Sequence, residues 1–106
     1  MRQAVLTAPE RIEFREVPDL TAAQLGEDEI LIRIKKIGIC GSEIHSYHGE
    51  HPATFYPVVQ GHEYSGIVTA VGSKVTRCKP GDKVTARPQL TCGQCAPFRR
   101  GQYNVC

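Results

Sequence analysis

Two short segments of the chain, GICGSEIH at 38–45 and GHEYSG at 61–66, contain the side chains best suited to chemistry. Cys40, His62 and Glu63 offer a thiolate, an imidazole and a carboxylate, which are the donor types that zinc binds in proteins. Three protein ligands and one open position are typical of a catalytic zinc, whereas four ligands make a closed structural site. The three residues therefore predict a catalytic metal site. The alternatives are a buried apolar cysteine and a hydrogen-bonded His-Glu pair on the surface.

The neighbouring positions of His62 and Glu63 set a geometric condition on this site. Successive residues of a regular strand point to opposite faces, so both side chains reach one ion only where the backbone is irregular. Gly61 stands directly before them and makes an irregular conformation accessible. Otherwise Glu63 lies behind the ligands that touch the metal, or a fourth ligand comes from beyond residue 106.

A second group of thiols lies near the end of the chain, at Cys92, Cys95 and Cys106. The chain has five cysteines, an odd number, and its first residues carry charges where a secretion signal needs an apolar segment. A disulfide framework is therefore not expected, and metal binding or free thiols are favoured. The segment from Pro88 onward is rich in Cys, Gly, Arg and Pro, which predicts an irregular lobe.

The elements that must position these residues are mostly short strands. Apolar patterning predicts strands at 3–8, 11–17, 29–39, 64–71 and 83–87, with turns rich in Gly and Pro between them. Only Ser42–His48 favours a helix, with Ser42 as its N-cap. In the strand at 29–39 we expect Ile30, Ile32 and Ile34 to share one face. Many short strands with little helix indicate a small β-barrel or sandwich.

Composition and charge are those of one globular domain. The 106 residues are 41% hydrophobic and 23% charged, with a formal net charge of +2. Acidic and basic residues are mixed along the chain, so neither a nucleic-acid surface nor a membrane surface is expected. The apolar stretches are too short to span a bilayer. A chain of this length buries a modest share of its surface, so a metal or a partner domain would support it.

Taken together, the motifs resemble the zinc-dependent medium-chain alcohol and polyol dehydrogenases. The resemblance rests on CGSEIH at 40–45 and GHEYSG at 61–66, followed in the family's order by Gly72, Val75 and GDKV at 81–84. It implies a mainly β fold, the GroES-like β-barrel of the N-terminal catalytic domain. We expect the barrel to be incomplete, with a cysteine-containing lobe at its C-terminal end. No Gly-x-Gly-x-x-Gly follows a strand, so no Rossmann domain is expected.

The resemblance also implies a reaction and the residues that perform it. Cys40, His62 and Glu63 match the catalytic zinc site, where zinc polarises an alcohol oxygen for hydride transfer to NAD or NADP. Ser42 matches the hydroxyl residue that hydrogen-bonds the reacting oxygen, and His45 matches a residue that passes the proton to solvent. The residues of these motifs look most similar to those of sorbitol and related polyol dehydrogenases. Threonine dehydrogenases are similar in the same segments.

The cysteine lobe departs from the family pattern. Many members hold a structural zinc on four cysteines, which this spacing would place at 92, 95, 98 and 106, but position 98 is Phe98. A closed tetrahedral zinc needs four donors, and phenylalanine offers none. Three interpretations stay open for Cys92, Cys95 and Cys106: a metal-free lobe, a weak zinc site completed by water or another residue, or free or oxidised thiols.

We therefore expect residues 1–106 to be a truncated GroES-like catalytic domain of a cytoplasmic, sorbitol- or iditol-type dehydrogenase. The nucleotide-binding domain is absent, so this part alone should be inactive, and a small alcohol or polyol is the expected substrate. Relatives are often dimers or tetramers, so the full-length enzyme is expected to be a homo-oligomer. The competing hypotheses are a non-enzymatic zinc-binding module and a zinc-free reductase of the quinone-reductase type. Cys40, together with His62 and Glu63, argues against the second.

Overall fold

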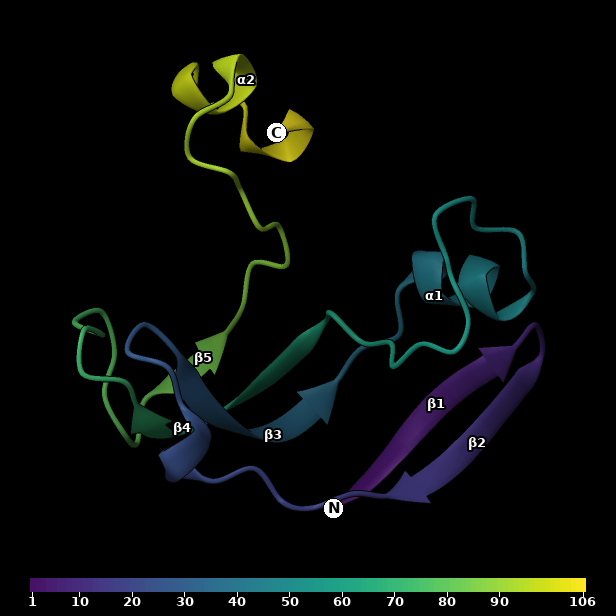
Figure 1. Ribbon diagram of the computed structural model, residues 1–106, viewed down its shortest axis with the longest axis horizontal. Coiled ribbons are helices and arrows are strands. Elements are labelled where there is room, and N and C mark those ends of the chain that lie inside the picture. Colours follow the sequence, from purple (N-terminus) through teal and green to yellow (C-terminus); the bar gives the residue numbers. More distant parts are fainter.

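The computed structural model describes residues 1–106 and consists mainly of two antiparallel sheets (Figure 1). The strands are β1 (Arg2–Ala8), β2 (Arg11–Glu16), β3 (Ile30–Ile37), β4 (Tyr64–Val71) and β5 (Lys83–Thr85). The helical segments are η1 (Ala22–Gln24), α1 (Gly41–Tyr47), α2 (Ala96–Arg99) and η2 (Tyr103–Val105). The predicted mainly β fold is confirmed. All strand pairs are antiparallel, so the chain contains no βαβ unit of the dinucleotide-binding kind.

The first sheet is the hairpin of β1 and β2, and it carries part of a small core. Val5 and Leu6 of β1 are almost fully buried. Leu6 also pairs with Val58, through backbone hydrogen bonds of 2.9 Å in both directions. This bridge ties the segment before the site to the hairpin.

The second sheet has the strand order β3-β4-β5 and contains Val68, the most deeply buried side chain. β4 has the predicted bounds, whereas β3 is shorter than expected at both ends. Register shifts interrupt the β3–β4 ladder between Leu31 and Ile32 and between Ile34 and Lys36. Ile34 is 43% exposed, whereas Ile30 and Ile32 are half-buried. Ile32 and Ile34 pair with Val68 and Gly66 with no register shift between them, so these two side chains lie on one face, as expected.

Helix α1 begins one residue earlier than predicted, and its N-cap is Cys40 rather than Ser42. The Cys40 N–H donates a 2.9 Å hydrogen bond to Oε2 of Glu43, three residues further on. A carboxylate at this position satisfies a backbone N–H at the helix start, as in a capping box. Serine capping was therefore a wrong prediction, and the cap places Cys40 at the junction of β3 and α1.

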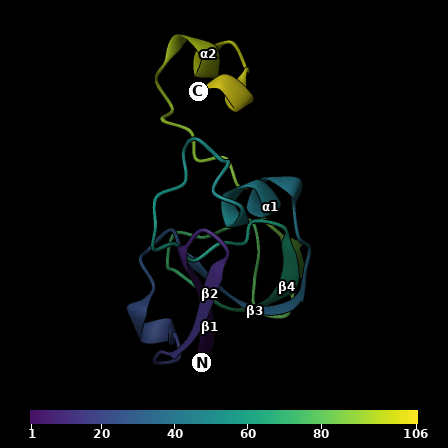
Figure 2. The same ribbon diagram turned by 90° about the vertical axis from the view of Figure 1, so that its right-hand side faces the viewer.

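The cysteine lobe, residues 91–106, follows an extended segment after β5 and lies apart from both sheets (Figures 1 and 2). The segment was predicted to be irregular, but it contains α2 and η2. The rings of Phe98 and Tyr103 meet with centroids 5.4 Å apart, which packs the two short helices together. The guanidinium of Arg87 lies 5.3 Å from the centre of the Tyr103 ring.

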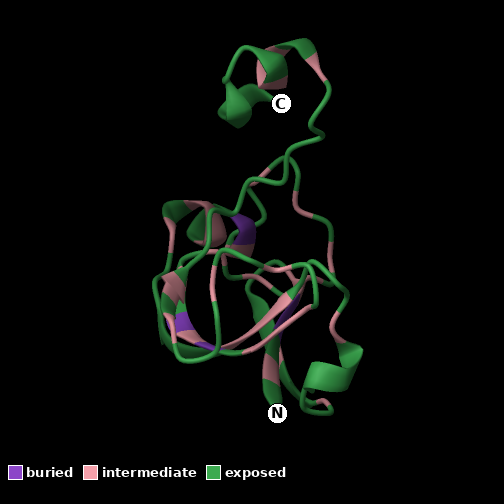
Figure 3. Ribbon diagram, turned by 90° about the vertical axis from the view of Figure 1, so that its left-hand side faces the viewer, coloured by how far each residue is buried: buried purple, intermediate pink, exposed green.

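Little of the chain is buried, as Figure 3 shows. Beyond the apolar core, Ser46 of α1 is buried, and its hydroxyl is 2.7 Å from that of Thr54. Several large apolar side chains are exposed, among them Phe14, Ile37, Ile39 and Phe55. No helix has the length and apolar character needed to cross a membrane.

Candidate metal centre

Cys40, His62 and Glu63 come together where β3 ends and β4 begins. Cys40 follows β3, and the other two residues directly precede β4. The two strands are neighbours with Ile37 paired to Tyr64, so their flanking residues meet at the same edge of the sheet. One ligand atom from each of Cys40, His62 and Glu63 lies within 4.8 Å of the others. The structure thus brings the three residues together, while their role as a metal site stays a prediction.

The backbone before β4 resolves the geometric condition on the two adjacent residues. Residues 61–63 lie outside the ladder, and Gly61 has a φ of +124°, which side-chain-bearing residues rarely adopt. The opposing chain also leaves room, because a Cβ on Gly38 would lie 2.8 Å from Oε2 of Glu63. The Gly38 N–H donates a 2.8 Å hydrogen bond to the Glu63 carbonyl. Two glycines thus allow His62 and Glu63 to face one point.

The sulfur of Cys40 and the ring of His62 form a polar pair. The pKa of the Cys40 thiol is lowered, first by hydrogen bonds from the side chain and backbone of Ser42 and then by one from His62. The pKa of His62 is raised, mainly by its hydrogen bond to Cys40. Both shifts favour a thiolate beside an imidazolium. A divalent cation would take the place of the imidazolium proton, because zinc binds a thiolate and a neutral imidazole.

Glu43 is a site residue to which the sequence analysis gave no role. Its Oε2 accepts the Cys40 N–H, while its Oε1 lies 3.7 Å from Nδ1 of His62. This Oε1 is buried without a hydrogen-bond partner, and the side chain is only 13% exposed. A carboxylate facing one imidazole nitrogen leaves the other for a metal. The signal in the sequence was the spacing Cys40-x-x-Glu43, which resembles a capping box.

Ser42 and His45 lie on α1, at different distances from the chemistry. Ser42 is half-buried, and its side chain and backbone lower the pKa of the Cys40 thiol, so it lies beside the predicted site. His45 is outside the group of possible metal ligands. Its side chain is exposed, and its Nδ1 lies 3.1 Å from Oε2 of Glu50. Both functional roles stay predictions, although the exposure of His45 suits exchange of a proton with solvent.

The group is accessible to solvent, because Glu63 is exposed and Cys40 and His62 are half-buried. His62 lines a pocket together with Tyr64, Arg87, Pro88 and Leu90, a mixture of apolar and cationic side chains. Three converging donors with an accessible face have the character of a catalytic rather than a closed metal site. The donor set, the room left by Gly38 and the orienting carboxylate of Glu43 together fit a zinc ion.

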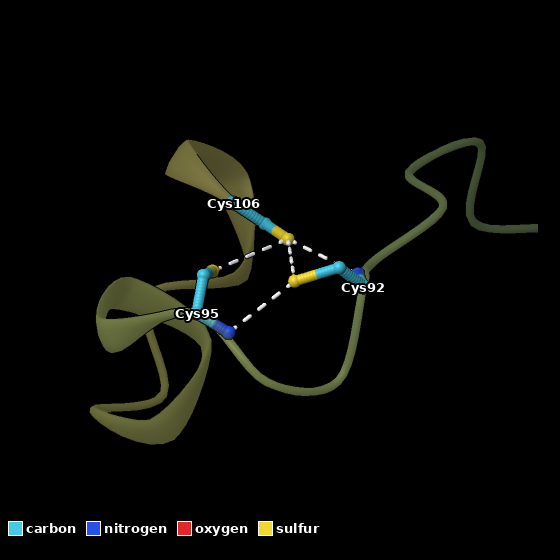
Figure 4. A group of neighbouring side chains, drawn as sticks. All are labelled: Cys92, Cys95 and Cys106. Carbon is cyan, nitrogen blue, oxygen red and sulfur yellow. Dashed lines mark hydrogen bonds between the residues drawn. The ribbon is translucent and has the colours of Figure 1, made fainter.

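The thiols of Cys92, Cys95 and Cys106 also lie close together (Figure 4). The sulfur of Cys106 lies 3.4 Å from that of Cys92 and 3.6 Å from that of Cys95. No histidine, aspartate or glutamate joins this group, and Phe98 contributes only a backbone N–H, which donates to the Cys95 sulfur at 3.4 Å. Three donors do not fit the closed tetrahedral zinc that many relatives are expected to hold.

Comparisons with known proteins extend these observations. The profile of the alcohol dehydrogenase GroES-like domain family matches residues 26–106. Sorbitol dehydrogenase of Bacillus subtilis (strain 168) is 39% identical over 111 residues, covering 100% of this chain and 30% of that protein. D-arabitol-phosphate dehydrogenase of Enterococcus avium is 43% identical over 89 residues, covering 83% of this chain and 25% of that protein.

A solved structure shows the same fold. It is described as a zinc-binding dehydrogenase from Sinorhizobium meliloti 1021 bound to NADP. Its TM-score is 0.82 at 36% identity, covering 99% of this chain and 30% of that one. The chain thus spans under a third of the length of these relatives. The profile match, the identities and the shared fold agree, and the chain belongs to the alcohol dehydrogenase GroES-like domain family.

Proposed function

We propose that residues 1–106 are the zinc-binding catalytic domain of an NAD- or NADP-dependent polyol dehydrogenase of the sorbitol or iditol type. One observation carries the proposal: the ligand atoms of Cys40, His62 and Glu63 lie within 4.8 Å of one another. These donors suit zinc by type, and the ionised Cys40 and Glu63 would balance the charge of a divalent ion. Relatives named as dehydrogenases of polyols support the substrate class.

The residues of this chain would hold the ion and orient the substrate. When bound, zinc supplies Lewis-acid polarisation of an alcohol oxygen. His62 would use the nitrogen turned away from Glu43, and Glu43 would fix the orientation of the ring. The open pocket beside His62 gives a small alcohol a route to the group.

Proton removal is the second task of the chain. The side chain of Ser42 lowers the pKa of the Cys40 thiol, so its hydroxyl lies beside the group that would hold the ion. His45 follows one turn later on α1 and contacts solvent. We propose that Ser42 accepts the alcohol proton and that His45 passes it on, because an imidazole exchanges protons readily near neutral pH.

The nicotinamide cofactor requires residues beyond the elements described. A dinucleotide is typically bound at a Gly-rich turn of a parallel βαβ unit, whereas all the strand pairs here are antiparallel. The chain alone should therefore not transfer hydride to NAD or NADP. For the whole protein we propose a cytoplasmic homo-oligomer with a polyol substrate and no nucleic-acid or membrane partner. The mixed surface charge supports the last point.

Metal analysis tests the site. We expect wild-type chain to retain one zinc at the Cys40 site, and Cys40→Ala to lose it, because a thiolate ligand is removed. Cys78→Ala is the matched control, since Cys78 is a free, half-buried cysteine outside both groups. Equal zinc in wild type and Cys40→Ala would exclude Cys40 as a ligand.

Activity of the protein that carries this chain tests the reaction. Reduction of NAD or NADP would be followed with sorbitol, iditol and arabitol as candidate substrates. Losing several kcal/mol of Lewis-acid stabilisation corresponds to a fall of about a thousandfold in kcat/KM for Cys40→Ala. An undiminished rate in Cys40→Ala would contradict the assignment.

A further inference from the structure

The three thiols of the cysteine lobe are free and close enough to react with one another. Cys92 and Cys106 are exposed, Cys95 is half-buried, and none of them is in a disulfide. Figure 4 shows all three sulfurs pointing to a common centre. The sulfur of Cys106 lies 3.4 Å from that of Cys92 and 3.6 Å from that of Cys95.

A fourth donor that would close a zinc site is missing from this group. Phe98 sits in α2, where its ring contacts Tyr103 rather than offering a ligand atom. A structural zinc is almost always held by four protein ligands. The three thiols of the lobe therefore converge as ligands of a metal would. The fourth ligand needed to hold a zinc ion, which would protect the thiols from oxidation, is absent.

The pKa values of Cys92 and Cys106 are shifted in opposite directions. Backbone N–H groups of Gln94 and Cys95 point at the Cys92 sulfur from 3.5 and 3.3 Å. They lower the pKa of Cys92 to about 7, with a further contribution from the Cys106 thiol. The Cys92 N–H lowers the pKa of Cys106, but hydrogen bonds with the Cys92 and Cys95 thiols, burial and the charge of Cys92 together raise it above its usual value.

We propose that the cysteine lobe is a peroxide-responsive site, in which Cys92 is the reacting thiolate and Cys106 the thiol that resolves it into a Cys92–Cys106 disulfide. An exposed thiolate next to a second thiol is the arrangement found in thiol sensors of oxidants. The oxidant class is a hydroperoxide, with hydrogen peroxide as its simplest member. The inference is independent of the proposed dehydrogenase function, because no residue of the Cys40 site takes part.

The reaction balances in two steps. The Cys92 thiolate attacks the outer oxygen of the hydroperoxide, the O–O bond breaks, and the leaving oxygen takes up a proton to give an alcohol or water. Sulfur gives up two electrons and becomes a sulfenic acid. The Cys106 sulfur then attacks the Cys92 sulfur, the S–O bond breaks, and the departing hydroxide leaves as water with the Cys106 proton. A thiol reductant would reduce the disulfide and restore both thiols.

The geometry favours this pair over the closer sequence neighbours Cys92 and Cys95. Cys95 is half-buried, and its sulfur caps α2 by accepting the Phe98 N–H at 3.4 Å; Cys106 is exposed, and its sulfur accepts the Cys92 N–H at 3.2 Å without capping a helix. A disulfide needs the sulfurs at about 2.0 Å. From a separation of 3.4 Å, rotation of the exposed side chains of Cys92 and Cys106 can close the remaining gap.

The test is oxidation of the chain by hydrogen peroxide near neutral pH, followed by alkylation of the remaining thiols and peptide mapping by mass spectrometry. We expect the Cys92–Cys106 disulfide to be the first product. Cys92→Ser should slow lobe oxidation at least tenfold, and Cys106→Ser should accumulate a Cys92 sulfenic acid that a dimedone probe captures. Cys95→Ser is the matched control and should still form the disulfide. Prior oxidation of Cys40 or Cys78, with Cys92 unchanged, would overturn the proposal.

The same oxidation carried out in the presence of zinc distinguishes an oxidant sensor from a metal site. With two equivalents of zinc present, one for each candidate group, we expect the lobe to be oxidised at nearly the rate without zinc. Complete protection by zinc, lost in Cys95→Ser, would show a metal site instead and would also overturn the proposal. Neither outcome bears on zinc at the Cys40 group, so the two hypotheses fail separately.

Discussion

Replacing Glu43 by glutamine tests whether this carboxylate supports the metal centre. Outer carboxylates that orient a zinc-bound histidine typically change metal affinity by about 10- to 100-fold when they are mutated. The contact from Oε1 to Nδ1 of His62 is 3.7 Å, longer than a hydrogen bond, which places the effect of Glu43→Gln at the lower end. Glutamine can still accept the Cys40 N–H, so the start of α1 should be kept. We therefore expect the zinc Kd to rise about tenfold in Glu43→Gln.

Glu43→Ala removes both contacts and should move towards the upper end of that range, about 100-fold, because the helix cap is lost as well. The assay is competition for zinc against a chromophoric chelator, in chains whose three lobe cysteines are replaced by serine. Circular dichroism of each variant would show whether the fold is retained.

Glu50→Gln provides the control for charge. Its carboxylate is exposed and faces His45 rather than the metal centre, so the same change should alter the zinc Kd by less than about twofold. If Glu43→Gln also bound zinc within that margin, Glu43 would be a helix cap only, and our argument that it orients His62 would be refuted.

Four further predictions follow from the same geometry. Gly38→Ala should weaken zinc binding without unfolding the chain, because its Cβ would lie 2.8 Å from the mobile end of Glu63; chelator competition measures this. Phe98→Cys should gain a tightly held zinc in the lobe, since it supplies a fourth thiolate, and unchanged metal content would contradict our interpretation of the lobe. Zinc affinity at the Cys40 site should fall on acidification beginning above pH ~6.5, because the pKa of His62 is raised and zinc needs the neutral ring. Gly72→Ala should lower the free energy of unfolding by at least about 2 kcal/mol in urea denaturation, since its Cβ would overlap neighbouring backbone oxygens.

Much of the fold could be predicted from local sequence patterns. The bounds of β4 followed from its apolar run, and β1 and β2 lie within one residue of the strands predicted at 3–8 and 11–17. The register shifts in the β3–β4 ladder did not follow, because bulges depend on how two strands meet and leave little trace in either strand alone.

The candidate site shows the same division between local and long-range information. Residue types identified Cys40, His62 and Glu63, but only the pairing of β3 with β4 brings them together. Glu43 was missed because its role depends on how close it lies to His62, and its own motif does not reveal that distance. The convergence of three lobe thiols was visible in their spacing, while the different environments of Cys92 and Cys106 depend on backbone N–H groups that sequence reasoning cannot place.

The most direct test of the metal centre is X-ray absorption at the zinc edge, on chain carrying one zinc and with serine at the three lobe cysteines. The account predicts one sulfur at about 2.3 Å and nitrogen or oxygen neighbours at about 2.0–2.2 Å, from Cys40, His62 and Glu63. A shell without sulfur would contradict the central claim that a thiolate, an imidazole and a carboxylate of this chain hold the ion.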